Sequence, residues 1–175
     1  MALLTAADLV HSADSVASAV SRVARAITNK LSHSHPVLLC VMNGGVPFAG
    51  HLMTRLSFPL DFDYLHVTRY GVETTGGHLV WRNEPSLPLC GRTVLVVDDI
   101  LDAGVTLAAI CERLRELGVA QCYTAVVAEK MTGRPKPIAA DFVALSVPNR
   151  FVFGYGMDVR GAWRNLPAIY ALREG

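Results

Sequence analysis

The sequence lacks a long apolar run. None of its segments approaches the ~18 consecutive apolar residues that a membrane-crossing helix requires. It also lacks a basic leader, and Asp8, His11 and Asp14 interrupt the N-terminal segment, so we expect no signal peptide. These absences predict a cytoplasmic protein without a membrane partner.

An excess of charge of one sign is missing too. The 16 basic and 15 acidic residues leave a net charge of +1. This balance argues against bulk electrostatic capture of nucleic acid, so we expect no nucleic-acid partner. The four cysteines show no CxxC spacing, and Cys40 and Cys122 lie within apolar runs, where buried thiols are common. We therefore interpret the cysteines as reduced thiols rather than disulfides.

Two nucleotide-binding motifs are absent. There is no GxxxxGK[ST] phosphate loop, and no GxGxxG follows the first apolar run. Internal repeats and linkers are absent as well, and 51% of the residues are hydrophobic. A chain of this length and composition can bury one core, so we expect residues 1–175 to form a single domain.

Apolar residues form two different patterns in the first half of the chain: a helical repeat and a continuous run. Positions 16–31 repeat every three or four residues, which predicts an amphipathic helix capped by Ser12 or Ser15. The apolar run 37–42 ends at Asn43-Gly44-Gly45, which favours a strand covered on both faces. We further predict a helix over 48–56, a strand over 61–68 and a mobile polar loop over about 69–80.

The second half continues the alternation of strand and helix. We predict strands over 93–97 and 122–128, a helix over 106–117 that stops at Gly118, and short extended segments over 142–147, 150–153 and 168–172. This order is typical of an α/β fold with a central, mainly parallel twisted sheet and helices on both faces. Ligands of such sheets bind beyond the carboxyl ends of the strands. The loops after Met42, Val97 and Ala128 should therefore meet at one site.

Three acids lie directly after the strand predicted over 93–97. Asp98 and Asp99 are adjacent, and Asp102 precedes Gly104 and Thr106 at the start of the next helix. Backbone amides of a turn and a helix N-terminus bind phosphate, and Gly104 permits the tight turn. The paired carboxylates can accept hydrogen bonds from sugar hydroxyls or support Mg²⁺ through water. The spacing therefore predicts a site for a pentose 5-phosphate.

Two other interpretations of the acids exist. Asp is a frequent cap and turn residue, so each acid alone could be structural. Paired acids also occur at strand ends in phospho-acceptor receiver domains. Those would follow the first strand, which here ends in Asn43-Gly44-Gly45.

The segment VLVVDDILDAGVTL (Val94–Leu107) resembles the phosphoribosyl-diphosphate binding motif of type I phosphoribosyltransferases. Lys130, the run 148–158 and Arg164-Asn165-Leu166-Pro167 are similar to hypoxanthine-guanine phosphoribosyltransferases, and the resemblance spans about 37–172. It implies the type I fold, with a small hood formed by the terminal segments. It also implies a magnesium-dependent purine-salvage glycosyltransferase that makes IMP and GMP from hypoxanthine, guanine and 5-phospho-α-D-ribose 1-diphosphate.

The resemblance assigns roles to individual residues. Asp102 is implied as the acid/base residue that accepts the purine N7 proton. Lys130 would donate to the purine O6, Phe151 would stack on the base, and the Val152 backbone and Asp158 would complete the purine site. The ribose 5-phosphate and diol would contact Asp98, Asp99, Asp102, Ala103, Gly104, Val105 and Thr106.

The remaining implied roles concern the diphosphate, the metal and the loop. Asn43, Gly44 and Arg164 would bind pyrophosphate, with a non-proline cis peptide at Met42–Asn43, and Asp98, Asp99 and Asp158 would contact Mg²⁺. Arg69 and Tyr70 would belong to the mobile loop, and the protein is expected to form a homo-oligomer, a dimer or tetramer. Two positions depart from the family pattern, since Asn43 replaces a frequent Lys and Ala103 a frequent Thr.

Two other functions stay open at this stage. A regulator could keep the phosphoribosyl site as a sensor and bind nucleic acid or a protein, although it should then carry a basic face. An enzyme for a pyrimidine, adenine or xanthine is the other alternative. Lys130 and the segment 151–158 argue against a pyrimidine or adenine as the substrate, and argue only weakly against xanthine.

Overall fold

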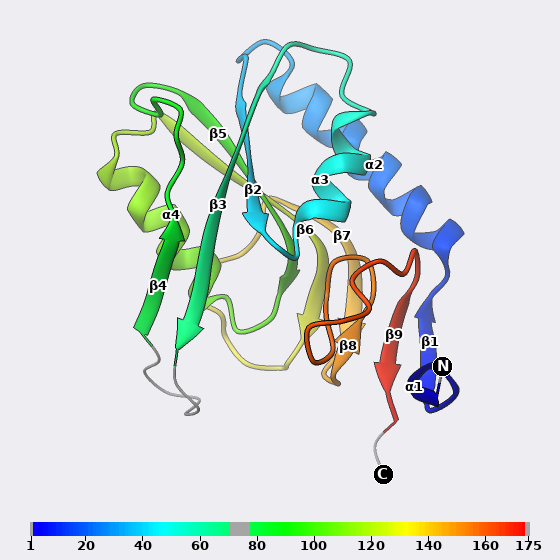
Figure 1. Ribbon diagram of the computed structural model, residues 1–175. Coiled ribbons are helices and arrows are strands. Elements are labelled where there is room, and N and C mark those ends of the chain that lie inside the picture. The colour runs from blue at the N-terminus through cyan, green and yellow to red at the C-terminus, as the bar shows by residue number, and fades with distance from the viewer. Residues whose placement is uncertain (1, 71–77, 174–175) are drawn as a thin grey trace.

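A six-stranded sheet lies at the centre of the computed structural model, which describes residues 2–70 and 78–173 (Figure 1). Its strand order is β4-β3-β2-β5-β6-β7, and only β4 runs antiparallel to its neighbour. The predicted mainly parallel sheet is therefore confirmed. The strands are β2 (Val37–Met42), β3 (Asp61–Tyr70), β4 (His78–Asn83), β5 (Thr93–Leu101), β6 (Gln121–Met131) and β7 (Phe142–Pro148).

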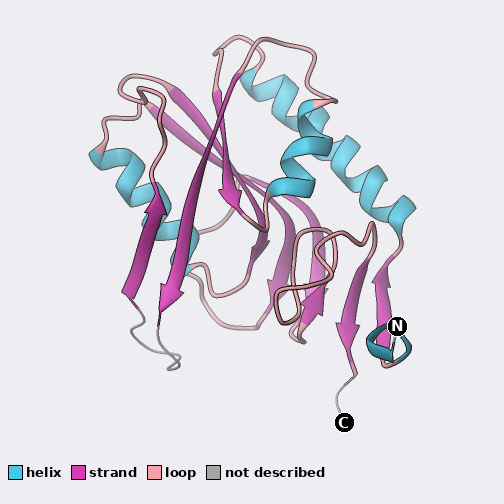
Figure 2. Cartoon of the chain, in the orientation of Figure 1, coloured by secondary structure: helices cyan, strands magenta, loops and turns pink. Residues whose placement is uncertain are grey.

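Helices cover both faces of this sheet (Figure 2). The helices α2 (Ala13–Leu31) and α3 (Val46–Met53) pack on one face, and α4 (Val105–Glu116) packs on the other. All four apolar residues at 94–97 are at most 1% exposed, because β5 lies between the two layers. Each such side chain contributes roughly 1.5–3 kcal/mol of burial free energy.

The first long helix, α2, begins at the predicted cap. Ser12 Oγ accepts a hydrogen bond from the Ser15 backbone amide at 3.2 Å, so Ser12 rather than Ser15 is the N-cap residue. Asp14 lies in the first turn and Lys30 in the last, as the helix dipole favours. The buried residues of α2 recur every three or four positions, which confirms the predicted amphipathic helix.

A three-stranded antiparallel sheet forms a hood beside the main sheet. Its order is β1-β9-β8, with β1 (Ala7–His11), β9 (Ile169–Leu172) and β8 (Val152–Phe153), so the two ends of the chain meet there (Figure 1). Arg150 Nη2 holds them together by donating to Asp8 Oδ2 at 2.8 Å and to the Leu172 carbonyl at 2.7 Å. The hood of terminal segments is thus confirmed, while β1 and the short α1 (Ala2–Thr5) carried no sequence prediction.

Several predicted boundaries were wrong. The loop predicted over 69–80 begins too early, because Arg69 pairs with Leu79 and Tyr70 with His78 in the β3–β4 hairpin; residues 71–77 lie outside the described residues. Backbone pairing extends these strands through polar residues that gave no strand pattern. β5 likewise continues four residues past the predicted end, to Leu101, because β6 pairs with it that far. The helix predicted over 48–56 is α3, Val46–Met53.

Asp63 anchors β3 to the segment that follows β4, and this contact yields a stability prediction. The buried carboxylate accepts hydrogen bonds from the backbone amides of Tyr64, Ser86 and Leu87 at 2.7–2.8 Å. Burial opposes ionisation, but these amides outweigh it and hold the Asp63 pKa below its usual value. We expect Asp63→Asn to lower the free energy of unfolding by about 1–3 kcal/mol at pH 7.

The pH dependence of this effect has a definite sign. Because the folded-state pKa is depressed, the stabilisation by Asp63 is present above the unfolded-state pKa and is lost as the pH falls through the folded-state value. Urea unfolding of both proteins between pH 7 and pH 3 should therefore show a gap that narrows on acidification. Glu112→Gln, on the exposed surface of α4, is the control and should stay within about 0.5 kcal/mol of the parent.

Candidate active site

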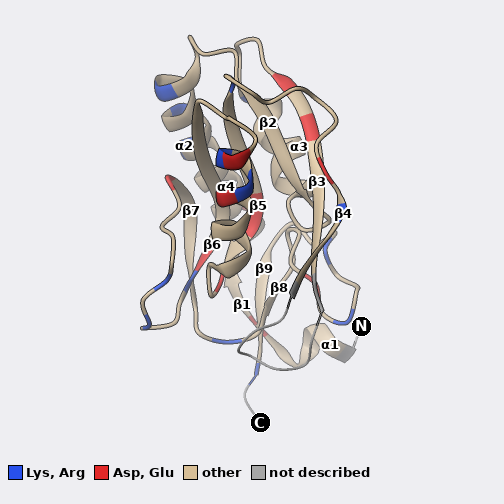
Figure 3. Ribbon diagram, turned by 90° about the vertical axis from the view of Figure 1, so that its left-hand side faces the viewer, with Lys and Arg blue, Asp and Glu red and all other residues tan. Residues whose placement is uncertain are grey.

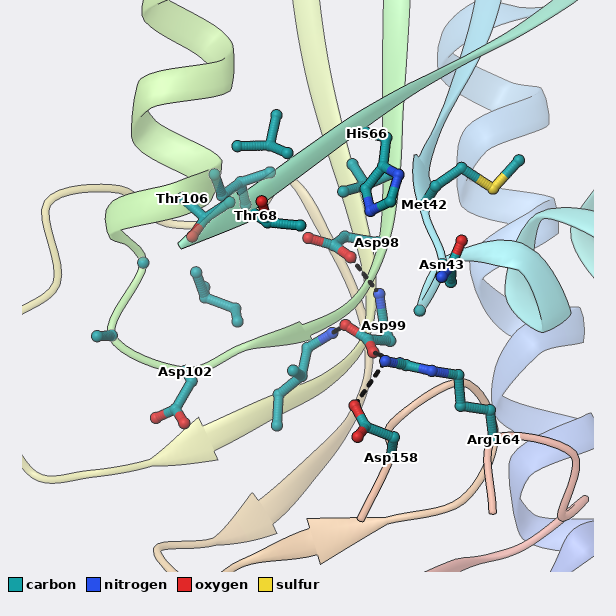
Figure 4. A pocket seen from close by; sticks show the side chains of 18 residues that line it. Met42, Asn43, His66, Thr68, Asp98, Asp99, Asp102, Thr106, Asp158 and Arg164 are labelled. Atoms are coloured by element: carbon teal, nitrogen blue, oxygen red, sulfur yellow. Dashed lines mark hydrogen bonds and ion pairs between the residues drawn. The ribbon is translucent and has the colours of Figure 1, made fainter. Parts of the chain in front are cut away.

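Asp98 and Asp99 lie side by side near the carboxyl end of β5 (Figure 4). Asp98 Oδ1 accepts a hydrogen bond from the Asp99 backbone amide at 2.9 Å, and Asp99 Oδ1 accepts one from the Ile100 amide at 2.7 Å. The Asp99 side chain is only 14% exposed. The strand order of the sheet thus places two neighbouring carboxylates at its ligand-binding edge.

The environment of these two acids disfavours their ionisation. Burial raises the pKa of Asp98 well above its usual value, and the charge of Asp99 raises it further. Burial also raises the pKa of Asp99, although the hydrogen bond with Asp98, the Ile100 amide and Arg164 oppose the rise. Carboxylates in this state are stabilised by a cation or by hydroxyl donors that approach from the open side. The pair can therefore bind a polyhydroxy ligand, a metal ion, or both.

The turn after β5 leads directly into α4. Gly104 has φ +79°, a left-handed conformation that glycine adopts without steric cost, and it precedes the first turn of the helix. Because Gly104 has no side chain, the N-terminal amides of α4 are not capped by this residue. Helix amides in this position, with Thr106 beside them, are suited to a phosphate group.

The turn after β2 closes the opposite side of the site. The Met42–Asn43 peptide bond is cis, as the family resemblance predicts. Gly44 packs so tightly against Asp99 that a Cβ atom there would overlap the Asp99 carboxylate. A residue larger than glycine at position 44 would therefore displace the Asp99 side chain.

The hood contributes a cation and a third acid. Arg164 Nη2 lies 2.6 Å from Asp158 Oδ1, and its Nη1 lies 3.8 Å from Asp99 Oδ2 (Figure 4). Arg164 Nη1 also donates to the Gly156 carbonyl at 2.6 Å. Asp158 Oδ2 accepts from the Gly161 amide at 2.7 Å, which holds its carboxylate in place. These contacts join the loops after β8 to the end of β5.

Together these segments enclose a cavity of about 510 Å³. Residues from β2, β3, β5, the start of α4 and the hood line it. The sequence-predicted residues among them are Asn43, Gly44, Asp98, Asp99, Asp102, Ala103, Gly104, Thr106, Asp158 and Arg164.

A second, smaller cavity of about 160 Å³ adjoins the first. The two share Ile100 and the acids Asp99, Asp102 and Asp158, and the second adds the predicted residues Lys130, Phe151 and Val152. Phe151 is 53% exposed, so its ring is not a core residue and a flat ligand can stack on it. The larger, acidic cavity thus adjoins a cavity lined by one lysine and one aromatic ring.

Asp102 and Lys130 form an ion pair where the two cavities meet. Lys130 Nζ lies 2.6 Å from Asp102 Oδ2, and the Lys130 side chain is only 13% exposed while that of Asp102 is 51% exposed. Asp102 therefore binds a side chain from β6, not the amides of α4. Lys130 is not a lysine that extends into solvent.

Three predicted residues are not seen to line these cavities, for two different reasons. The side chain of Val105 is 47% exposed, and Val105 lines neither cavity. Arg69 and Tyr70 end β3, and their side chains lie outside the described residues. The structure therefore brings together every other residue that the sequence singled out.

Sequence reasoning missed the contribution of β3. Met42 pairs with His66, and His66 and Thr68 line the larger cavity beside the two acids (Figure 4). The signal was available, because β3 was predicted as a strand and its carboxyl end meets the same edge of the sheet.

Comparison with known proteins shows which family the chain belongs to. A family model described as a phosphoribosyl transferase domain matches residues 7–160. The chain is 30% identical over 162 residues to a hypoxanthine-guanine phosphoribosyltransferase of Streptococcus pneumoniae, covering 92% of this chain and 90% of that protein. The chain belongs to the hypoxanthine-guanine phosphoribosyltransferases.

Other members of this family agree in sequence and fold. A hypoxanthine-guanine-xanthine phosphoribosyltransferase of Tritrichomonas foetus is 29% identical over 95% of this chain and 91% of that protein. A solved hypoxanthine phosphoribosyltransferase of Staphylococcus aureus has a TM-score of 0.91 over 99% of this chain and 95% of its own, at 24% identity, and supports the fold. Within this family fold, the acids of β5 and the hood lie at the ligand-binding edge.

The raised pKa of Asp98 predicts that this residue lowers the free energy of unfolding at pH 7. A carboxyl whose folded-state pKa exceeds its unfolded-state value loses stabilisation as the pH rises through that interval, so it destabilises the fold at pH 7. Asp98→Asn keeps an oxygen for the Asp99 amide and removes the charge. We expect it to raise the free energy of unfolding at pH 7 by about 1–2 kcal/mol, measured by urea denaturation. A variant that is less stable than the parent at pH 7 would contradict this electrostatic account.

Proposed function

We propose that this chain transfers the 5-phosphoribosyl group of 5-phospho-α-D-ribose 1-diphosphate to hypoxanthine and guanine, giving IMP or GMP and pyrophosphate. The observation that carries the proposal is the junction of two cavities at Asp99, Asp102 and Asp158. One cavity has the chemistry for a sugar phosphate and the other has the chemistry for a 6-oxopurine. A reaction that joins the two ligands has to occur where the cavities meet.

The larger cavity supports binding of the diphosphate sugar. The 5-phosphate would lie on the turn 103–106, where backbone amides and the Thr106 hydroxyl donate. Asp98 and Asp99 would accept from the 2- and 3-hydroxyl groups, whose donors stabilise the charged form of these buried acids. The diphosphate would lie toward Asn43, Gly44 and Arg164, where a guanidinium suits a phosphate oxygen.

The donor set fits Mg²⁺ carried by the substrate. Among the described residues, no three His, Cys, Asp or Glu side chains come together as a metal site of their own. Mg²⁺ commonly binds one or two carboxylates plus substrate phosphates and waters. Asp158 on the hood and the pair Asp98 and Asp99 would hold the ion, which would neutralise charge on the leaving diphosphate.

The smaller cavity supports a 6-oxopurine. An ammonium offers only hydrogen-bond donors, so Lys130 would donate to O6 and would leave the amino group of adenine without a partner. Phe151 would stack on the ring, and Val152 would contact its edge. We assign the residues 1–175 to one phosphoribosyltransferase domain with this purine site under the hood.

The chemistry requires the Asp102–Lys130 ion pair to open. As the purine enters, O6 takes the Lys130 donor and the N7 hydrogen approaches the freed Asp102 carboxylate. The bond between the anomeric carbon and the diphosphate oxygen breaks, the bond from that carbon to N9 forms, and Asp102 accepts the N7 proton. The ion pair thus keeps the proton acceptor occupied until the base arrives.

We also propose a cytoplasmic homo-oligomer, a dimer or a tetramer. Cys111 Sγ and Cys122 Sγ lie 3.7 Å apart as free thiols, which suits a reducing compartment. Phe62 and Tyr64 are more than 40% exposed on β3, as an apolar contact between subunits would require. No helix in the described part of the chain is long and apolar enough to cross a membrane.

The regulator alternative is not favoured. In Figure 3, the charged positions of α4 lie at one end of the helix and include both red and blue ones. The ion pairs Arg113–Glu116 and Arg115–Glu112 account for this pattern. A face of this kind offers little attraction to a nucleic acid.

A substrate screen tests the proposal. Purified protein with Mg²⁺ and the diphosphate sugar should form IMP and GMP, with kcat/KM for adenine at least about 100-fold lower, because the adenine amino group cannot accept from Lys130. Product formation is measured by chromatography for hypoxanthine, guanine, xanthine and adenine. The proposal is falsified if the folded protein makes no nucleotide from hypoxanthine or guanine.

The role of Asp102 is tested by Asp102→Asn. The variant keeps the shape of the side chain but cannot act as a base, so kcat should fall by about 10²–10⁴-fold. Calorimetry of IMP binding is the control and should change less than about tenfold. Equal losses in kcat and in IMP affinity would assign Asp102 to binding alone.

A further inference from the structure

Lys136 is a largely buried lysine that the proposed mechanism does not use. It lies in the turn after β6, and its side chain is only 11% exposed. Its ammonium lies 3.0 Å from the Leu101 carbonyl, 2.8 Å from the Lys130 carbonyl and 3.1 Å from Glu129 Oε1. All three donors of the ammonium therefore have an acceptor, and the carboxylate of Glu129 balances its charge.

The two carbonyls belong to the backbone on either side of the Asp102–Lys130 ion pair. Leu101 is bonded directly to Asp102, and Lys130 carries the ammonium of the pair itself. Leu101 pairs with Glu129 at the last register position that joins β5 and β6. Beyond this position, the structure shows no further pairing between these two strands. Lys136 thus links β5 and β6 where their ladder stops.

The segment that carries Lys136 also lies next to the turn at Gly104. A Cβ atom on Gly104 would lie 3.4 Å from Lys136 Cβ and 3.3 Å from Pro137 Cδ, so the turn lies directly against this segment. Lys136 therefore contacts the backbone of Leu101 and lies next to Gly104. Asp102 lies between Leu101 and Gly104 in the chain.

We propose that Lys136 is a positioning residue that sets the separation of Asp102 and Lys130. By binding the carbonyls of Leu101 and Lys130 with one ammonium, it fixes the backbone that carries the proton acceptor relative to the backbone that carries the O6 donor. The purine must contact both residues at once, so an error of about 1 Å in their separation would slow the reaction by up to about 100-fold. This inference rests on the proposed function.

The test uses Lys136→Met, which keeps the aliphatic stem and removes the donors. We expect kcat for IMP formation to fall by about ten- to 100-fold. Lys136→Arg keeps the charge and several donors and should recover most of that loss. Lys30→Met, at the exposed end of α2, is the matched control and should leave kcat within twofold.

A double-mutant cycle separates positioning from general stability. In the Asp102→Asn background there is no base to position, so adding Lys136→Met should lower kcat by less than about threefold. A purely structural lysine would give the same fold loss in both backgrounds. If Lys136→Met unfolds below the assay temperature, Lys136→Gln replaces it in both backgrounds, because its amide still donates to one carbonyl.

The outcomes distinguish this inference from the proposed function. If the parent protein makes no nucleotide, the proposed function fails and the role of Lys136 fails with it. If the parent is active and the Lys136 variant stays within twofold, or shows equal losses in both backgrounds, only the positioning role is overturned.

Discussion

The burial of Asp98 and Asp99 at the end of β5 is the constraint on which the rest of the site depends. Partial burial raises the pKa of both carboxyls, and the charge of Asp99 raises that of Asp98 further, so the pair costs free energy in the folded protein. The surrounding structure responds at several points. Backbone amides of β5 donate to both, and Arg164 reaches across from the hood toward Asp99. The two carboxyls thus lower the stability of the ligand-free fold. A ligand that supplies hydrogen-bond donors or positive charge would stabilise them.

The same constraint explains the close packing around the acids. Gly44 leaves room for the Asp99 carboxylate, so the turn after β2 approaches β5 as closely as backbone can. Arg164 is bound to Asp158 and to the Gly156 carbonyl within the segment between β8 and β9, and its approach to Asp99 joins this segment to the main sheet. The hood therefore completes the site, although it comes from the ends of the chain.

A second electrostatic element, the Asp102–Lys130 ion pair, lies where the two cavities meet. Asp102 and Lys130 neutralise each other at 2.6 Å, and Lys136 binds the backbone on both sides of them. A lysine bound to a backbone carbonyl keeps its position without competing for the ligand. The two lysines therefore differ in their partners: Lys130 binds a side chain that lines both cavities, and Lys136 binds backbone carbonyls.

Much of the fold could be predicted from local pattern. The α2 periodicity, the continuous apolar runs of β2 and β5 and the stop at Gly118 reflect interactions within a few residues. The hairpin of β3 and β4 could not be found in this way, because its polar residues are held by backbone pairing with each other. β1 was missed for a related reason, since its partner β9 lies at the other end of the chain.

The sequence by itself determined the chemistry of the site. The spacing of Asp98, Asp99, Asp102, Gly104 and Thr106 is a property of one strand, one turn and one helix start, so it could be read along the chain. Only the tertiary structure decided which groups meet across the chain: Lys130 with Asp102, Arg164 with Asp158, His66 beside the acids, and Lys136 with carbonyls of both β5 and β6. The reason is that these contacts depend on strand order and on packing of the hood. The spacing of residues along the chain does not show which strands become neighbours.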